Sequence, residues 1–118
     1  MAAAVLLYNL PAPKADKLRA LCVRQGVQAL FVPPRDQGKT IGQLLGLPIP
    51  AKPGPGTVPG ELMVLSGFTS QALDDFLDDF GPAGVGPIPM KAVVTPHNLA
   101  WTGVELYLEL VKERRAEH

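Results

Sequence analysis

The stretch Met90-Lys91-Ala92-Val93-Val94-Thr95-Pro96-His97-Asn98-Leu99-Ala100-Trp101-Thr102 decides the fold, because it joins the last predicted strand to the last predicted helix. Proline cannot donate to a strand ladder and pushes the residue before it toward extended geometry, so Pro96 predicts a strand that stops near Thr95. Thr102 and Glu105 have the spacing of a capping box, in which each side chain satisfies a free backbone N–H at a helix start. The stretch therefore predicts a short, rigid turn between Pro96 and Thr102.

Apolar runs and helix-end signals predict the other elements. Strands without polar alternation are typical of a sheet that is covered on both faces. Capping residues, prolines and glycines mark where the helices between them begin and end. The predicted strands are Ala4 to Asn9, Gln28 to Val32, Leu62 to Leu65 and about Ile88 to Thr95, and the predicted helices run from about Pro13 to Gly26, Thr40 to Leu45, Thr69 to Phe80 and Gly103 to about Arg115.

An internal repeat emerges when the chain is shifted by 58 positions without a gap. Leu7 then falls on Leu65, and Gly26 falls on Gly84. We therefore expect two βαβ repeats, residues 4–33 and 61–95, each with parallel strands and a right-handed crossover.

Two architectures can hold these repeats within a single α/β domain of residues 1–118. If the helix near Ile41 carries the chain back across the sheet, all four strands are parallel in the order 2-1-3-4, with helices on both faces. We expect this mostly parallel α/β fold, because its second helix layer covers the other face of the strands. The alternative is an α+β ferredoxin-like sheet, in which the second and third strands are antiparallel neighbours. The Pro/Gly-rich excursion 47–60 is too short to separate two domains, and the C-terminal helix spans 102–116.

Composition excludes several classes of protein. The chain has 118 residues, of which 47% are hydrophobic, and its formal net charge is zero. Residues 1–60 hold seven Lys/Arg and two Asp/Glu (+5), whereas residues 61–118 hold four and nine (−5). This balance, without a basic stripe, argues against a nucleic acid partner. A single cysteine cannot form an internal disulfide or complete a zinc ligand set, so we expect no metal or cofactor.

The expected localisation is cytoplasmic and reduced. The opening Met1–Leu7 lacks the basic leader of a signal peptide. No apolar run reaches the roughly 18 residues of a membrane helix, so no membrane partner is expected.

Motifs of nucleotide and acyl chemistry are incomplete. Gly38-Lys39-Thr40 follows a strand as in a P-loop, but Pro33 stands where the first glycine is required and offers no N–H to a phosphate. We therefore expect no tight binding of ATP or GTP. Ser66 at a strand-to-helix turn resembles a nucleophile elbow, but Val64 stands where that motif needs glycine, and His97 is the only internal histidine.

Acidic residues on the helix after Thr69 form a predicted solvated face. They are Asp74, Asp75, Asp78 and Asp79. Their charge is opposite to that of the basic first helix, so a homo-oligomer through head-to-tail contacts is conceivable.

A ligand site is expected beyond the carboxyl ends of the strands, where open α/β sheets bind their ligands. The first and third strands would bring together Tyr8, Asn9, Ser66 and Gly67, and the fourth would add Thr95, His97, Asn98 and Trp101 if the sheet is parallel throughout. Free N–H groups near Thr69 would favour a small polar or anionic ligand, or a partner's acidic segment. In the alternative interpretation, Thr95 and Asn98 only hydrogen-bond the turn, and Trp101 only packs against Leu106 as a hydrophobic staple.

Two segments carry a resemblance to a known family. Glu61-Leu62-Met63-Val64-Leu65-Ser66-Gly67-Phe68 and Lys91-Ala92-Val93-Val94-Thr95-Pro96, followed by Asn98, Trp101 and Thr102, resemble the uncharacterised bacterial family recorded as domain of unknown function 3783. The resemblance is strongest over residues 61–110 and implies no established activity.

No paired carboxylates, metal set or complete triad can be assembled from the sequence. The function that we expect is therefore a small ligand-sensing or partner-binding module. The alternative is a small enzyme that uses His97 or Ser66.

Overall fold

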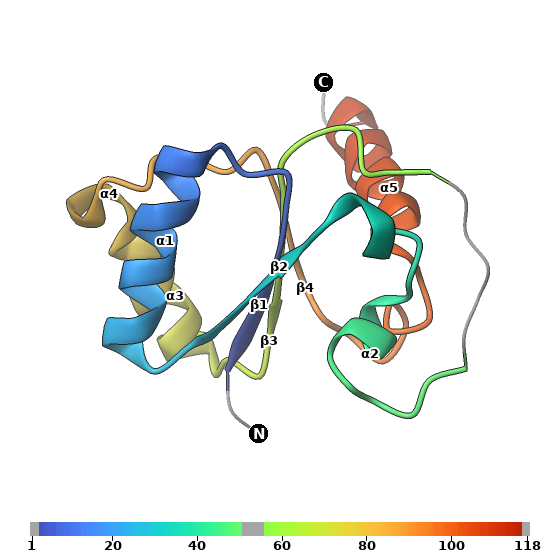
Figure 1. Cartoon of the computed structure of the whole chain (residues 1–118), viewed down its shortest axis with the longest axis horizontal. Coiled ribbons are helices and arrows are strands. Elements are labelled where there is room, and N and C mark those ends of the chain that lie inside the picture. The colour runs from blue at the N-terminus through green and yellow to red at the C-terminus, as the bar shows by residue number, and fades with distance from the viewer. Residues whose placement is uncertain (1–2, 51–55, 117–118) are drawn as a thin grey trace.

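A four-stranded sheet stands between two layers of helices in the computed structural model, which describes residues 3–50 and 56–116 (Figure 1). The sheet has the order β2-β1-β3-β4, as predicted. Its strands are β1 (Ala4–Tyr8), β2 (Gln28–Val32), β3 (Leu62–Ser66) and β4 (Met90–Val93). Helices α1 (Ala12–Gln25), α3 (Ser70–Asp78) and α4 (Phe80–Ala83) cover one face. Helices α2 (Ile41–Leu44) and α5 (Gly103–Ala116) cover the other, and a 3-10 helix, η1 (Pro34–Asp36), follows β2.

Side-chain caps start α2, α3 and α5 where the sequence predicts. At α5, the Thr102 N–H donates to Glu105 Oε1 (3.0 Å), and the Glu105 N–H donates to Thr102 Oγ1 (3.2 Å). These reciprocal bonds form the predicted capping box. Thr69 accepts from the Ala72 N–H (3.1 Å) at the start of α3. Gly26 ends α1 with φ of 68°, a left-handed conformation that glycine adopts without steric cost.

Two local predictions need correction. The fourth strand is shorter than predicted, since β4 covers only Met90–Val93. Gly81-Pro82 does not end the helical structure, because a second short helix, α4, includes both residues. Pro82 lies in the first turn of α4, where a backbone N–H would have no partner within the helix. On α5, Leu108 is 55% exposed. It lies two residues from buried Leu106 and thus on the opposite side of α5.

The predicted all-parallel sheet is wrong at its centre. β1 and β2 are parallel, and so are β3 and β4, but β1 and β3 are antiparallel. Ala4 pairs with Ser66 and Tyr8 pairs with Leu62. The ferredoxin-like alternative is not formed either, because β1 lies between β2 and β3. The sheet is therefore mixed, although helices cover both of its faces.

A buried amide network explains the antiparallel pair. Gln37 Nε2 donates to Asn9 Oδ1 (3.0 Å) and to the Val32 carbonyl (3.2 Å), and Gln37 Oε1 accepts from the Val58 N–H (2.8 Å). Asn9 Nδ2 donates to the carbonyls of Val58 (2.7 Å) and Gly60 (2.9 Å). These bonds hold the end of the excursion against the carboxyl end of β1. Because β3 begins at that edge, it must run in the opposite direction to β1.

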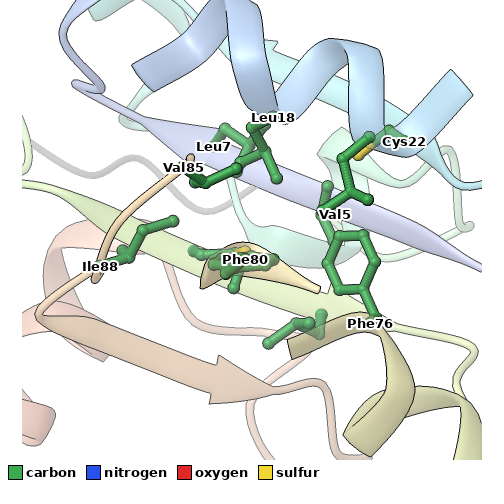
Figure 2. Packing of buried hydrophobic residues seen from close by; sticks show 11 residues of the cluster. Val5, Leu7, Leu18, Cys22, Phe76, Phe80, Val85 and Ile88 are labelled. Carbon is green, nitrogen blue, oxygen red and sulfur yellow. The ribbon is translucent and has the colours of Figure 1, made fainter. Parts of the chain in front are cut away.

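Two hydrophobic clusters lie on the two faces of the sheet. Val5 and Leu7 of β1 point to the cluster beneath α1, α3 and α4, which Figure 2 shows, while Leu6 and Tyr8 point to the cluster beneath α2 and α5. All four side chains are buried, as expected for an apolar run without alternation. Cys22 packs in the first cluster, where burial raises the pKa of its thiol to about 11. The thiol thus stays protonated at neutral pH and acts as a core residue.

Tyr8 brings an unpartnered hydroxyl into the second cluster. Its side chain is completely buried, and the hydroxyl has no hydrogen-bond partner within the described parts of the chain. Burial also raises the pKa of Tyr8 above its usual value. The ring lies against Gly103 at the start of α5, where an added Cβ would stand 2.6 Å from Tyr8 Cε2. Close packing, rather than a polar contact, therefore holds this end of α5 against β1.

We expect Gln37→Met to lower the free energy of unfolding by about 2–4 kcal/mol, because it leaves the Val58 N–H and the side-chain oxygen Oδ1 of Asn9 without their partner. Urea denaturation measures the loss. The matched control Gln71→Met removes an exposed amide on α3 and should change stability by less than about 0.5 kcal/mol. Equal effects of the two substitutions would contradict the role of Gln37.

Tyr8→Phe should leave the free energy of unfolding unchanged or raise it by up to about 1 kcal/mol, because the hydroxyl pays for desolvation without a bond in return. Gly103→Ala should lower it by about 1–3 kcal/mol through overpacking against the same ring. Thermal denaturation tests both, and a clear loss in Tyr8→Phe would disprove an unpartnered hydroxyl.

Candidate functional site

The mixed sheet separates the predicted site residues into two groups. Asn9 follows β1 and lies at the edge where β3 begins, because Tyr8 pairs with Leu62. Ser66 and Gly67 lie at the opposite edge, beside Ala4. The predicted meeting of Tyr8 and Asn9 with Ser66 and Gly67 is therefore wrong. Asn9 instead belongs to the amide network that anchors the excursion.

Because β3 and β4 are parallel, the remaining predicted site residues lie at one edge of the sheet. Leu65 pairs with Val93, and the Val94 N–H donates to the Leu65 carbonyl (2.8 Å). Ser66 and Gly67 thus leave the sheet at the same edge as Thr95 and the turn that follows it. The strands whose carboxyl ends meet at this edge both belong to the second half of the chain.

A groove of about 360 Å³ opens between the end of β4 and α5. Four of the predicted site residues line it, and α5 supplies most of the rest. We call it the β4–α5 groove, and it is lined by Ala92, Thr95, His97, Asn98, Trp101, Leu106, Glu109, Leu110 and Glu113. The rings of His97 and Trp101 meet edge to face, with their centroids 5.1 Å apart.

Asn98 builds the wall of this groove by closing the turn. The Thr95 N–H donates to Asn98 Oδ1 (2.9 Å), and the Asn98 N–H donates to Thr95 Oγ1 (3.2 Å). Asn98 Nδ2 donates to the Val93 carbonyl (3.1 Å). Because Asn98 is only 7% exposed and its amide is engaged at both ends, it holds the rim in shape. Thr95 and Asn98 therefore hydrogen-bond the turn, as the alternative interpretation of the sequence describes.

His97 and Trp101 differ from Asn98 in what they offer a ligand. The His97 side chain is exposed and makes no hydrogen bond within residues 3–50 and 56–116. Trp101 is half-buried and joins the cluster that contains Leu106, as expected for a hydrophobic staple. It also lines a second hollow of about 420 Å³ on the outer side of α5, together with exposed Leu108. Trp101 thus packs against the cluster that contains Leu106 and also lines the β4–α5 groove.

The acidic wall of the groove was not predicted from the sequence. Glu109 and Glu113 are four residues apart on α5, so they lie on the same side of the helix and both face the groove. Neither forms an ion pair or hydrogen bond with another described residue. Their spacing from the capping residue Glu105 was the signal in the sequence, since all three recur at intervals of four. The groove therefore combines two carboxylates with an imidazole and an indole.

The other motifs have structural partners. Lys39 pairs with Asp36 (3.2 Å), and Thr40 caps α2 by accepting from the Gln43 N–H (3.1 Å). Ser66 does not line the β4–α5 groove, and it makes no hydrogen bond to His97. A nucleophile and base are thus not assembled at this edge.

The acidic face of α3 is solvated, as predicted. Asp75 accepts from Gln71, and Asp79 accepts from Gln25 of α1. Within the described residues, no group of three or more His, Cys, Asp or Glu side chains could hold a metal ion.

Fold and groove together define a small α/β domain whose candidate site lies between an edge strand and the helix that follows it. Residues 61–116 match the model of a protein family that is described as a domain of unknown function (DUF3783). This match over residues 61–116 confirms the resemblance predicted from the sequence. The match contains β3, β4, α5 and every residue of the β4–α5 groove, whereas Asn9 lies outside it.

Comparisons with curated proteins and with solved structures found no match. None of the helices in the described ranges is long and apolar enough to cross a membrane.

We expect Asn98→Ala to lower the free energy of unfolding by about 1–3 kcal/mol, because the turn loses its side-chain bonds to Thr95 and to the Val93 carbonyl. His97→Ala, one residue away, should change it by less than about 0.5 kcal/mol, since the imidazole is exposed. Thermal denaturation of both variants distinguishes Asn98, which holds the rim in shape, from His97, which is exposed at the groove. A loss of several degrees in His97→Ala would contradict this division.

Proposed function

We propose that this chain is a cytoplasmic partner-binding module, and that its β4–α5 groove takes a cationic group of the partner, such as a guanidinium or an ammonium. One observation carries the proposal. The carboxylates of Glu109 and Glu113 line the groove without an ion pair to another described residue, and Trp101 and His97 line the same groove.

The lining favours a cation over the anionic ligand expected from the sequence. Two carboxylates on one wall would repel an anion, whereas a guanidinium can form charge-assisted bonds to them. An indole face also attracts a cation, with an energy of about 0.5–2 kcal/mol that increases with desolvation. Because Glu109 is half-buried, its attraction for a cation is screened less than that of a fully exposed carboxylate. The free helix start near Thr69, which suggested an anion, does not line the groove.

We also infer that the two halves of the chain are copies of one ancestral unit. The bounds of β3 lie 58 positions after those of β1. Leu6 and Val64 are likewise 58 apart, and they face each other in the antiparallel pair, so a twofold axis relating the halves would pass between them. Thr40 and Thr102 each begin a helix with a capping box, and they are joined by an isolated bridge.

The inferred repeat supports a site in the second half only. The helix after β2 is α2, with four residues, whereas the helix after β4 is α5, with 14. Only the longer helix reaches far enough to present Glu109 and Glu113 beside the strand. On this proposal the first half completes the sheet, and the second half carries the site.

The alternative function is a small enzyme that uses His97 or Ser66. His97 has an accessible imidazole at the groove, which a general base requires. Ser66 makes no hydrogen bond to His97 and does not line the β4–α5 groove, so the structure does not pair this hydroxyl with that base. Binding is therefore the function that the geometry supports best.

Trp101 is the single tryptophan of the chain, so its fluorescence reports on the groove directly. We expect an acetylated tripeptide amide of arginine to change this emission saturably, and added salt to weaken the binding. Glu109→Gln combined with Glu113→Gln should weaken binding at least tenfold, which corresponds to about 1.4 kcal/mol.

The matched control is Asp74→Asn combined with Asp78→Asn. It removes two exposed carboxylates at the same spacing from α3, on the other face of the sheet, and should leave binding unchanged. Equal weakening by both pairs would reveal general attraction to an acidic half, and the proposal would then fail. Absence of a saturable response would contradict it as well.

A further inference from the structure

The outer edge of β4 has backbone groups without partners. Among the described strands, β4 lies at the edge of the sheet and pairs only with β3. The Val94 N–H donates to the Leu65 carbonyl, and in a parallel ladder both backbone groups of every second residue point to the same side. Lys91 and Val93 therefore direct their N–H and C=O groups away from β3. The Val93 carbonyl accepts from Asn98 Nδ2, but the Lys91 N–H and C=O and the Val93 N–H have no partner in the described chain.

Hollows flank this edge on both faces of the sheet. The β4–α5 groove lies on one face, where Ala92 of β4 lines it below Glu109 and Glu113. An apolar pocket of about 370 Å³ lies on the other face. We call it the β4–α4 pocket, and it is lined by Leu77, Phe80, Gly81, Gly86, Pro87, Ile88 and Lys91. Val93, on the same face as Lys91, is 48% exposed. One edge strand thus lies between an acidic groove and an apolar pocket.

We infer that β4 binds an extended segment of a partner by strand addition, with basic and apolar side chains in alternation. Main-chain hydrogen bonds to Lys91 and Val93 would hold the segment. Successive side chains of a strand point to opposite faces, so a basic side chain would enter the β4–α5 groove while its neighbour entered the β4–α4 pocket. This inference rests on the proposed function and names the form of the partner.

The edge of β4 suits one short segment rather than an open-ended sheet. β4 has only four residues, and Pro89 and Pro96 flank it. Short edges next to prolines block uncontrolled pairing. The two carboxylates of the β4–α5 groove distinguish β4 from the other edge strand, β2, whose Phe31 ring centre lies 4.5 Å from the Arg19 guanidinium.

The test uses the full chain and an acetylated hexapeptide amide that alternates valine and arginine. Lys91→Pro removes an N–H that points away from β3, so the β3–β4 ladder remains, and φ near −65° is tolerated on an edge strand. Lys91→Thr removes the charge but keeps the N–H. We expect the hexapeptide to bind Lys91→Pro at least tenfold more weakly than Lys91→Thr.

Hydrogen exchange of the unmodified chain gives a readout that does not depend on any variant. Saturating hexapeptide should slow the exchange of the Lys91 and Val93 amides at least tenfold. Unchanged exchange at both amides would overturn strand addition, even if the peptide binds, and so would equal binding to the two Lys91 variants. A retained Trp101 response to the arginine tripeptide would then leave the proposed function standing. If Lys91→Pro fails to fold, the exchange result decides alone.

Discussion

The direction of the central strands depends on the completely buried amide of Gln37. Burial of an unpaired amide costs about 1–3 kcal/mol, so the fold must supply partners for both ends of this side chain. Those partners come from Asn9 after β1, from Val32 at the end of β2, and from Val58 at the end of the excursion. The network therefore ties three separate segments to one edge of the sheet. The chain can enter β3 only from that edge, and the antiparallel pairing of β1 and β3 follows.

The antiparallel central pair changes where a site can form. In an all-parallel sheet, the carboxyl ends of every strand meet at one edge, and ligands bind in the crevice there. Here β1 and β2 end at one edge, whereas β3 and β4 end at the other. The carboxyl ends of the strands in the two halves of the chain thus lie at opposite edges of the sheet. The first edge is occupied by the Gln37 network, and the second carries the β4–α5 groove, within the segment that matches the DUF3783 family.

Local signals in the sequence predicted most of the elements, because their causes lie within a few residues. Thr102 and Glu105, for example, need only each other to start a helix. Strand direction was not predictable in this way, since Gln37 and Val58 are 21 positions apart and Asn9 and Val58 are 49 apart. The acidic wall was missed for a related reason. Whether Glu109 faces a groove or open solvent depends on how α5 packs against β4.

Asn98 connects the shape of the groove to the edge of the sheet. Its side chain closes the turn against Thr95 and occupies the outward carbonyl of Val93, so it sets the point at which the unpaired edge of β4 ends. The same bonds fix the backbone that carries His97 and Trp101. A rim that is rigid before binding loses less entropy when a ligand arrives, and this preorganisation favours affinity. The role of Asn98 is therefore positional. The chemistry of the groove comes from His97, Trp101 and the two carboxylates of α5.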